Sequence, residues 1–355
     1  MLRVELLPAG YGDAILVSYG SGDTPQHHIL IDAGQAKTSD TVIERLDALR
    51  TAGGVVDLFV VTHIDNDHIG GALKLLDEPV IAGMIKAIWF NGYVHLDRAA
   101  GLLGPIQGEK LTEQIVDLQL AWNPDWPHPI DSRVGGPVVV KQPVSRDLPG
   151  GATALVLSPT PQKLVRLQAV WKEVVEAAGL RPGREAEEEP PVVAPGLLGG
   201  TLADLADDRS SSDTSAANGS SIAFVLEYQG KRILFAADAH PDVLTEGLGQ
   251  IAEKPYRLDA CKLPHHGSKG NVTKSLVKAL DCPLWLVSSN GVRFRHPDDA
   301  ALARVILGSA RGDRRPVIGW NYHSKRLKQF TSSFPPDRSR YKVLEPTDGG
   351  LVLDL

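Results

Sequence analysis

The first 90 residues alternate short apolar runs with one amphipathic stretch. Residues 2–7, 13–19 and 27–33 are runs rich in Val, Ile and Leu, separated by turns that contain Gly or Pro, and each predicts a β-strand. Residues 39–53 carry apolar side chains at helical spacing and end in a glycine pair, which predicts a helix. Residues 57–63 contain a continuous apolar run, as in a strand buried on both faces, and lead directly into a polar loop.

The same alternation continues, with one interruption, to residue 290. Between residues 101 and 200 the pattern weakens, and residues 221–240 then predict two strands joined by a Gln-Gly turn. No repeat of fixed period is visible in the sequence. Further strands are predicted at 86–90, 153–159, 259–267 and 283–290, and further helices at 70–78 and 160–180.

Charge is distributed very unevenly along the chain, whose formal net charge is −6. Residues 184–213 hold eight acidic and two basic residues and so carry the whole excess. This region is rich in Pro and Glu, which predicts a partly disordered insertion at about 181–217, within a domain of residues 1–308. Residues 309–342 hold nine basic and two acidic residues. We expect residues 309–355 to complete or flank the same domain.

Several classes of protein are excluded by composition. The sequence has no apolar run of the roughly 18 residues that a membrane span needs. Its N-terminus has no signal-peptide layout, and its two cysteines, Cys261 and Cys282, form no CxxC pair. These features predict a protein without a membrane partner in the reducing cytoplasm.

A cluster of metal-binding residue types follows the apolar run at 57–63. His63, Asp65, Asp67 and His68 lie within six residues and precede two glycines. A metal site needs several nitrogen and oxygen donors that converge, and a short loop between a strand and a helix can aim four of them inward. A solvated polar loop is the alternative interpretation of the same residues.

This loop resembles the HxHxDH signature of the metallo-β-lactamase superfamily, with Asp65 in place of the second histidine. The HxDxDH variant resembles the nuclease-like domain of bacterial DNA-uptake channel proteins and their soluble relatives. Further matches follow in the same order: GYGDAILV, ILIDAG, LFAADAH, KLPHHGS and FRHPDDA. The resemblance implies an α+β fold, the four-layer αβ/βα sandwich, with a site for two divalent metal ions, Zn²⁺ or Mn²⁺.

The resemblance also implies roles for individual residues. One metal ion would bind His63 and Asp65 and the other Asp67 and His68, with Asp238 bridging them; a helix cap is the alternative role of Asp238. Asp32 would brace the metal-binding loop. Asn91 and His95 lie at no convincing spacing for a further ligand, which leaves a more oxygen-rich site and makes Mn²⁺ a competitor to Zn²⁺. The late ligands would be His266 and His296, with His265 as general acid or as a satisfied polar residue.

These features together predict a metal-dependent hydrolase, specifically a phosphodiesterase or nuclease acting on DNA or RNA. Asp67 would orient a hydroxide activated by two metals, while Ser268, Lys269 and nearby amides bind phosphate. Two alternatives stay open: a hydrolase of small esters, lactones or thioesters, and a non-enzymatic regulatory module on the same scaffold. Aromatic residues interleave the basic segment, so Lys325, Arg326 and Lys328 would bind a nucleic-acid strand, unless this segment is a solvated edge with ordinary core aromatics.

Overall fold

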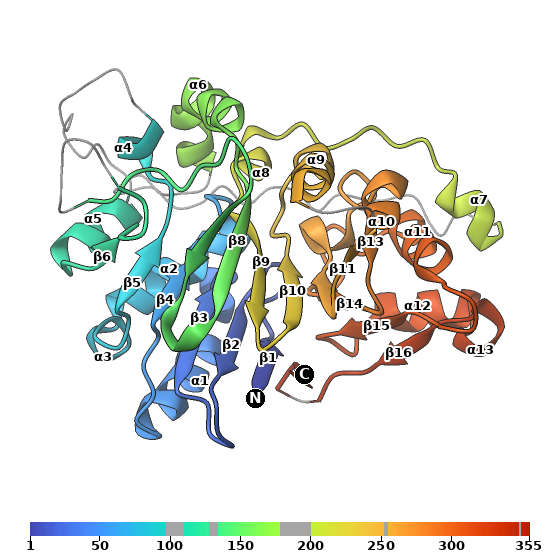
Figure 1. Cartoon of the computed structure of the whole chain (residues 1–355), viewed down its shortest axis with the longest axis horizontal. Coiled ribbons are helices and arrows are strands. Elements are labelled where there is room, and N and C mark those ends of the chain that lie inside the picture. The colour runs from blue at the N-terminus through green and yellow to red at the C-terminus, as the bar shows by residue number, and fades with distance from the viewer. Residues whose placement is uncertain (97–109, 128–133, 178–199, 252–254, 348) are drawn as a thin grey trace.

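Two β-sheets face each other in the middle of the molecule, and helices cover both outer faces (Figure 1). This is the four-layer αβ/βα sandwich that the sequence predicted. The structure is a computed structural model and describes residues 1–96, 110–127, 134–177, 200–251, 255–347 and 349–355.

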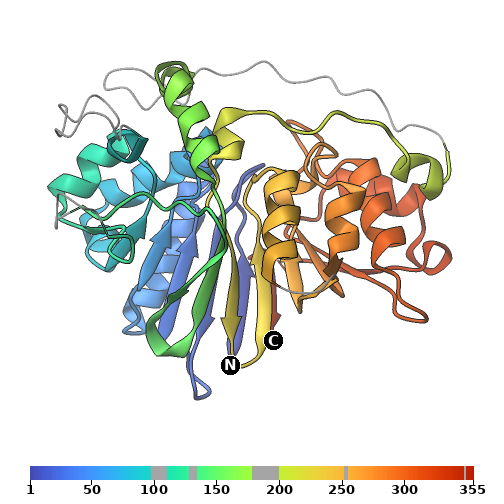
Figure 2. The same cartoon turned by 45° about the horizontal axis from the view of Figure 1, so that its top comes forward.

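The first sheet has seven strands, antiparallel from β17 to β3 and parallel from β3 to β6. Its first strand in the spatial order comes from the C-terminus of the chain, so the two chain ends lie side by side (Figure 2). In spatial order the strands are β17 (Leu351–Asp354), β1 (Leu2–Leu6), β2 (Ile15–Tyr19), β3 (His27–Ile31), β4 (Leu58–Val60), β5 (Ala87–Trp89) and β6 (Ala121–Trp122).

The second sheet has eight strands and the same division into an antiparallel and a parallel part. A separate pair, β11 (Tyr256–Arg257) and β13 (Leu280–Asp281), forms a small parallel sheet. In spatial order the eight strands are β16 (Lys342–Leu344), β15 (Val317–Trp320), β14 (Leu284–Val287), β12 (Ala260–Lys262), β10 (Lys231–Phe235), β9 (Ala223–Tyr228), β8 (Thr153–Ser158) and β7 (Val144–Asp147).

Helices on the side of the first sheet are α1 (Ser39–Thr51), α2 (Asn66–Asp77), α3 (Pro79–Ala82), α4 (Tyr93–Leu96), α5 (Lys110–Asp117), α6 (Pro161–Ala177) and α8 (Ala216–Gly219). Those on the side of the second sheet are α7 (Leu202–Ala206), α9 (Pro241–Ile251), α10 (Lys274–Ala279), α11 (Asp299–Ser309), α12 (Lys325–Ser333) and α13 (Pro336–Ser339). Three 3₁₀ turns are η1 (Ala36–Thr38), η2 (Pro149–Gly151) and η3 (Pro264–Gly267). None of the described helices is long and apolar enough to cross a membrane.

The β4 strand shows why the sandwich has separate apolar layers. Leu58 and Val60 pack between the two sheets, whereas Phe59 and Val61 pack against the helices of the first sheet. Successive side chains of a strand point to opposite faces, so a strand covered on both sides must be apolar throughout. The structure therefore confirms the prediction of a strand buried on both faces within residues 57–63.

The region from 181 to 217 differs in part from its prediction. Residues 181–199 lie outside the described residues. Residues 200–217 contain α7 and the start of α8, and a capping box at Thr201 and Asp204 begins α7. Leu205 and Ala206 pack against α11. This part contains helices because its few apolar side chains are buried. The many acidic residues around them gave no indication of this in the sequence.

The basic C-terminal segment supplies strands to both sheets. Residues 309–355 contain β15 and β16 of the second sheet and β17 of the first. Trp320, Phe330 and Tyr341 are buried in the core beneath α11 and α12. These three aromatic side chains cannot stack on nucleotide bases, so the interpretation as ordinary core residues is the correct one for them.

Gly71 in α2 lies close to the loop after β3. A Cβ atom on Gly71 would lie 2.0 Å from the backbone oxygen of Ala33, which cannot move without shifting Asp32. Gly71→Ala should therefore lower the free energy of unfolding by about 1–3 kcal/mol, measured by urea denaturation.

The matched control is Gly247→Ala in α9, where the added Cβ would make only ordinary contacts of 3.6 Å or more. Alanine is the better helix former by about 1 kcal/mol, so this variant should be neutral or more stable. Equal loss of stability in both variants would contradict the close-packing argument.

Candidate metal centre

The carboxylate of Asp238 lies at the centre of four histidine side chains. Asp238 follows β10 and is 2% exposed. Its Oδ1 atom lies 3.4 Å from Nε2 of His68, and its Oδ2 atom lies 4.0, 3.6 and 3.7 Å from Nε2 of His63, His265 and His266. All four imidazoles thus present the same ring nitrogen to one buried carboxylate.

Residues at the carboxyl ends of strands from both sheets build this arrangement. Asp32 follows β3 and His63 follows β4 in the first sheet, while Asp238 and His266 follow β10 and β12 in the second. His68 lies in the first turn of α2. Because parallel strands end at one edge of a sheet, these loops meet across the sandwich.

His68 is held from behind by Asp32. The Asp32 carboxylate lies 2.7 Å from Nδ1 of His68 and accepts two hydrogen bonds from Thr62, one from its amide and one from its hydroxyl. A carboxylate only accepts, so the proton of His68 is on Nδ1 and its Nε2 lone pair faces Asp238. Asp32 thus has the bracing position that the sequence predicted for it.

The other three histidines are held in the same tautomer. Nδ1 of His266 donates to the carbonyl of Ser288 at 2.9 Å. Nδ1 of His63 donates to the Thr62 hydroxyl at 3.0 Å, because that hydroxyl already donates its own proton to Asp32. Nδ1 of His265 lies 3.3 Å from Oδ2 of Asp213. In the neutral form of each ring, the Nε2 lone pair therefore faces Asp238.

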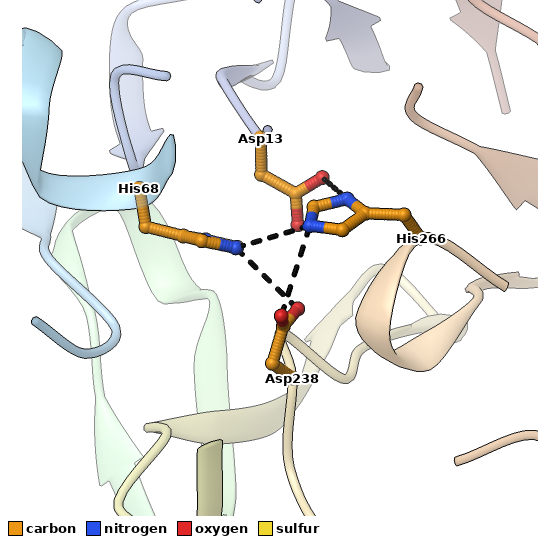
Figure 3. Close-up of side chains that lie close together, drawn as sticks. All are labelled: Asp13, His68, Asp238 and His266. Carbon is orange, nitrogen blue, oxygen red and sulfur yellow. Dashed lines mark hydrogen bonds and ion pairs between the residues drawn. The ribbon is translucent and has the colours of Figure 1, made fainter. Parts of the chain in front are cut away.

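Figure 3 shows the tightest part of the site, where His68 and His266 point toward each other above Asp238. Their Nε2 atoms are 3.2 Å apart, and ligand atoms of Asp13, His68, Asp238 and His266 all lie within 4.8 Å of one another. Asp13 lies on the far side of the His266 ring, 3.3 Å from Nδ1, and forms a buried ion pair with Lys262.

Asp65 and Asp67 reach the site from the start of α2. Asp65 is at the N-cap but makes no capping hydrogen bond, and its Oδ2 atom lies 3.6 Å from Nε2 of His63. Oδ2 of Asp67 lies 3.3 Å from Nε2 of His266. The four residues of the predicted loop are therefore together around Asp238.

The residues fit a site for divalent cations. Nε2 of His63 and Oδ1 of Asp238 are buried and have no hydrogen-bond partner among the residues that the structure describes. A buried polar atom without a partner is costly unless a ligand satisfies it. Imidazole and carboxylate donors at one point are the set that Zn²⁺ and Mn²⁺ prefer. This is a buried His/Asp metal site.

Charged groups within the site shift the pKa values of one another. Burial would raise the pKa of Asp238, but His265, His68 and His266 hold it well below its ordinary value. Burial would lower the pKa of His265, yet Asp238 and Asp213 raise it to about 9. The carboxylates are therefore ionised and ready to bind cations.

A strained turn presents His265 and His266 side by side. Their φ angles are 47° and 52°, in the left-handed region, which costs roughly 1–2 kcal/mol per residue. Gly267 follows with a φ of 88°, and a Cβ there would lie 2.5 Å from Cβ of Pro297. This turn is therefore locally unfavourable, and its conformation points two adjacent imidazoles toward Asp238.

His296 lies beside the cluster rather than within it. Its ring is 5.4 Å from that of His265 and stacks on Phe294. The carboxylate nearest to it is that of Asp298, 3.7 Å from its Nδ1 atom. Its side chain is 13% exposed. The structure therefore brings His265 into the cluster around Asp238 and leaves His296, which the sequence placed among the ligands, beside it.

The groups that were predicted to bind a phosphate, at Ser268, Lys269 and the nearby amides, contact other parts of the protein. The amide of Ser268 donates to the carbonyl of His265, and that of Lys269 donates to Asp298. The Lys269 ammonium pairs with Asp208, and the Gly270 amide donates to the Ser268 hydroxyl. The amides of Ser268 and Lys269 and the Lys269 ammonium therefore already have partners within the protein.

The three predicted nucleic-acid contacts on α12 divide into two kinds. Lys325 and Lys328 are exposed. Arg326 is buried, pairs with Asp299 and donates to the carbonyls of Arg295 and Pro297. Arg326 therefore holds the loop that carries His296 and cannot contact a phosphate.

Neither Asn91 nor His95 completes the site. Asn91 exchanges two hydrogen bonds with the backbone of Val138. His95 packs against Trp122, and its Nε2 atom lies 3.1 Å from the carbonyl of Gly135. Both side chains are structural, so the missing nitrogen ligand must come from elsewhere, and His265 is in place for it.

Sequence reasoning missed two residues of the site. Asp13 lies in the matched segment GYGDAILV, directly before a buried strand, and this position was the available signal. Asp213 lies in the acidic stretch, where nothing in the local sequence distinguishes it from seven other carboxylates. Only its contact with His265 identifies it.

Alanine variants of three histidines test this arrangement. His265→Ala and His266→Ala should each bind less metal than the wild type, because each loses an Nε2 donor. His296→Ala should keep its metal. Metal content after dialysis is measured by mass spectrometry, with circular dichroism as the control for folding. Metal loss in His296→Ala but not in His265→Ala would restore the sequence interpretation.

Comparisons with known proteins agree with the fold. Residues 7–100 match the metallo-beta-lactamase superfamily, a range that includes the loop from His63 to His68. Among curated protein sequences, none matches the chain.

Several solved structures are similar to the chain at low sequence identity. Zn²⁺-bound PqqB from Methylobacterium extorquens is 12% identical, over 99% of this chain and 100% of that one, with a TM-score of 0.42. YhfI from Bacillus subtilis, a metallo-beta-lactamase fold protein, is 10% identical over 100% of both chains, with a TM-score of 0.40. A diphosphatase of the PhnP family is 13% identical over 100% and 98%, with a TM-score of 0.39. None of these three is a DNA-uptake protein.

The matched segment, the four-layer sandwich and the buried His/Asp cluster agree with one another. Together they indicate the metallo-β-lactamase fold with a buried His/Asp metal site, in which residues 7–100 are similar to the metallo-β-lactamase superfamily.

Proposed function

We propose that the protein is a phosphodiesterase that binds two divalent cations around Asp238. The observation that carries this proposal is the surplus of donors at one point: four Nε2 atoms and three carboxylates converge there. One cation has room for four to six ligands, so this set suits two that share Asp238.

The charge of the site supports both the number of cations and the class of substrate. Within the described residues, Asp65, Asp67 and Asp238 have no Lys or Arg partner, whereas the nearby Asp13 is paired with Lys262. Two divalent cations would outweigh these three carboxylates by one positive charge. A phosphodiester carries one negative charge, so it fits this balance better than a neutral ester or lactone does.

We assign the ligands to two groups by proximity. His63, Asp65 and His265 would hold one cation, since His63 and Asp65 are neighbours and His265 faces the same Asp238 oxygen as His63 does. Asp67, His68 and His266 would hold the other, because their ligand atoms lie within 4.0 Å of one another.

The cations supply Lewis acidity, which polarises a phosphoryl oxygen and lowers the pKa of a water molecule. The protein supplies the orientation. Asp32 and the Ser288 carbonyl fix the rings of His68 and His266, so the donors need no reorganisation when a substrate binds. Asp67 in the first turn of α2 is placed to orient the attacking water.

His296 is proposed to hydrogen-bond to the phosphoryl group or the leaving oxygen. It lies next to His265 and is partly exposed, and Arg326 anchors its loop from behind through the carbonyls of Arg295 and Pro297. A rigid loop is what a substrate contact requires, because a misplaced donor loses most of its effect.

Hydrolysis of bis-p-nitrophenyl phosphate tests the reaction class. The metal-loaded protein should release p-nitrophenolate, and a chelator should abolish the activity. His296→Ala should lower kcat by about 10²–10³-fold, as expected for the loss of one preorganised donor, with its metal content unchanged.

Lys231→Gln is the matched control, because Lys231 lies at the opposite end of β10 from Asp238. Its kcat should equal that of the wild type. Efficient hydrolysis of a lactone or thioester, with no diester hydrolysed by the loaded protein, would contradict the proposal and favour a small-molecule hydrolase.

Salt dependence decides whether the diester is a nucleic acid. Lys325 and Lys328 are exposed on α12, whose Arg326 contacts the loop of His296. If a single strand runs over this helix, each lysine should contribute about 0.7 to the slope of log affinity against log salt. Lys325→Gln with Lys328→Gln should then flatten the slope by about 1.4, as measured by fluorescence anisotropy.

The same double variant should hydrolyse bis-p-nitrophenyl phosphate at the wild-type rate, because both side chains lie outside the metal cluster. If the wild type shows no salt-dependent binding to DNA or RNA, the substrate is a small diester, and the two lysines belong to a solvated edge.

A further inference from the structure

A chain of polar contacts connects His265 to a lysine on α6. Asp213 lies between them: its Oδ2 atom is 3.3 Å from Nδ1 of His265, and its Oδ1 atom is 3.8 Å from Nε2 of His240. Nδ1 of His240 lies 2.7 Å from the ammonium of Lys163. The chain thus runs from the metal centre to a helix that belongs to none of the metal-binding loops.

The direction of each proton in this chain follows from the donors and acceptors. Lys163 only donates, so Nδ1 of His240 accepts and its proton is on Nε2, toward Asp213. The Asp213 carboxylate then faces donors only. The proton of His265 is on Nδ1, which faces both Oδ2 of Asp213 at 3.3 Å and Oδ1 of Asn271 at 3.1 Å.

Asp213 is also fixed by amide donors. Its Oδ2 atom accepts hydrogen bonds from the side chains of Asn218, at 2.7 Å, and Asn271, at 3.0 Å. Its Oδ1 atom accepts one from the amide of Ser215 at 2.8 Å. Such a carboxylate has little freedom, so it can set the orientation of the imidazole it contacts.

The segment that carries Asp213 is clamped to the turn that follows His265. The buried guanidinium of Arg304 donates to the carbonyls of Asp208 on one side and of Lys269 and Val272 on the other. The amide of Asp213 itself donates to the carbonyl of Gly270 at 3.3 Å. Contacts outside the metal centre therefore fix the positions of Asp213 and His265 relative to each other.

We propose that Asp213 is a positioning residue that presents His265 to the metal, and that Lys163 fixes Asp213 through His240. This inference rests on the proposed function only in taking His265 as a metal ligand. A carboxylate behind a metal-binding imidazole fixes its tautomer and raises its basicity, and loss of such a partner costs about 10–100-fold in metal affinity.

Zn²⁺ titration of the metal-free, full-length protein against a chelating dye tests the proposal without any substrate. Asp213→Ala should weaken one of the two binding steps by about 10–100-fold and leave the other unchanged, because His265 serves a single cation. Lys163→Met should weaken the same step by a smaller factor. The ¹⁵N resonances of His265 should change from one tautomer to a mixture in Asp213→Ala.

Asp242→Asn is the matched control. Asp242 also contacts Lys163, at 3.4 Å, but its side chain is 72% exposed and it has no contact with Asp213 among the described residues. Its two binding steps should match those of the wild type. Urea denaturation of the metal-free variants separates a loss of affinity from a loss of folding, and Asp213→Asn, which keeps the shape of the side chain, replaces Asp213→Ala if the latter fails to fold.

Wild-type affinity at both steps in Asp213→Ala, or equal weakening of both steps in Lys163→Met, would overturn the proposal. The outcome is separate from the proposed reaction. If one binding step depends on Asp213 but no diester is hydrolysed, the positioning role stands and the phosphodiesterase assignment falls.

Discussion

The fold is organised around the placement of one buried carboxylate among four imidazoles. An ionised Asp238 away from water is costly by itself, and four histidine nitrogens without ligands add to that cost. Cations bound between these groups would remove both penalties at once. The free energy of metal binding would then also be free energy of folding for the loops that converge here, which would couple the chemistry of the site to the stability of the sandwich.

The sandwich supplies rigidity from two sides. Each sheet sends loops to the site from the carboxyl ends of its parallel strands, and each sheet is covered by helices on its outer face. A site built between two such layers cannot relax by moving one of them, since the apolar core between the sheets holds them together. That rigidity is what allows the turn of His265 and His266 to keep two successive residues in a left-handed conformation.

Each imidazole is oriented by a partner behind it, and these partners come from different parts of the chain. Asp32 follows β3, Ser288 follows β14, and Asp213 comes from the segment between α7 and α8. This second layer of contacts decides which nitrogen of each ring faces the cations. It also explains why a lysine on α6 or an arginine on α11 can influence a site that neither of them touches.

The sequence alone determined most of the elements and the cluster from His63 to His68, because these depend on local periodicity and on ligands close together in the chain, whereas the sandwich followed only from the resemblance to a known family. Tertiary structure decided the rest. Arg326 looked like a phosphate contact, yet its guanidinium is buried against Asp299. Asp213 looked like one carboxylate of a disordered stretch, yet it meets His265 from 52 residues away in the chain. Burial and the choice of partner across such separations depend on packing between the layers, which no local pattern of residues records.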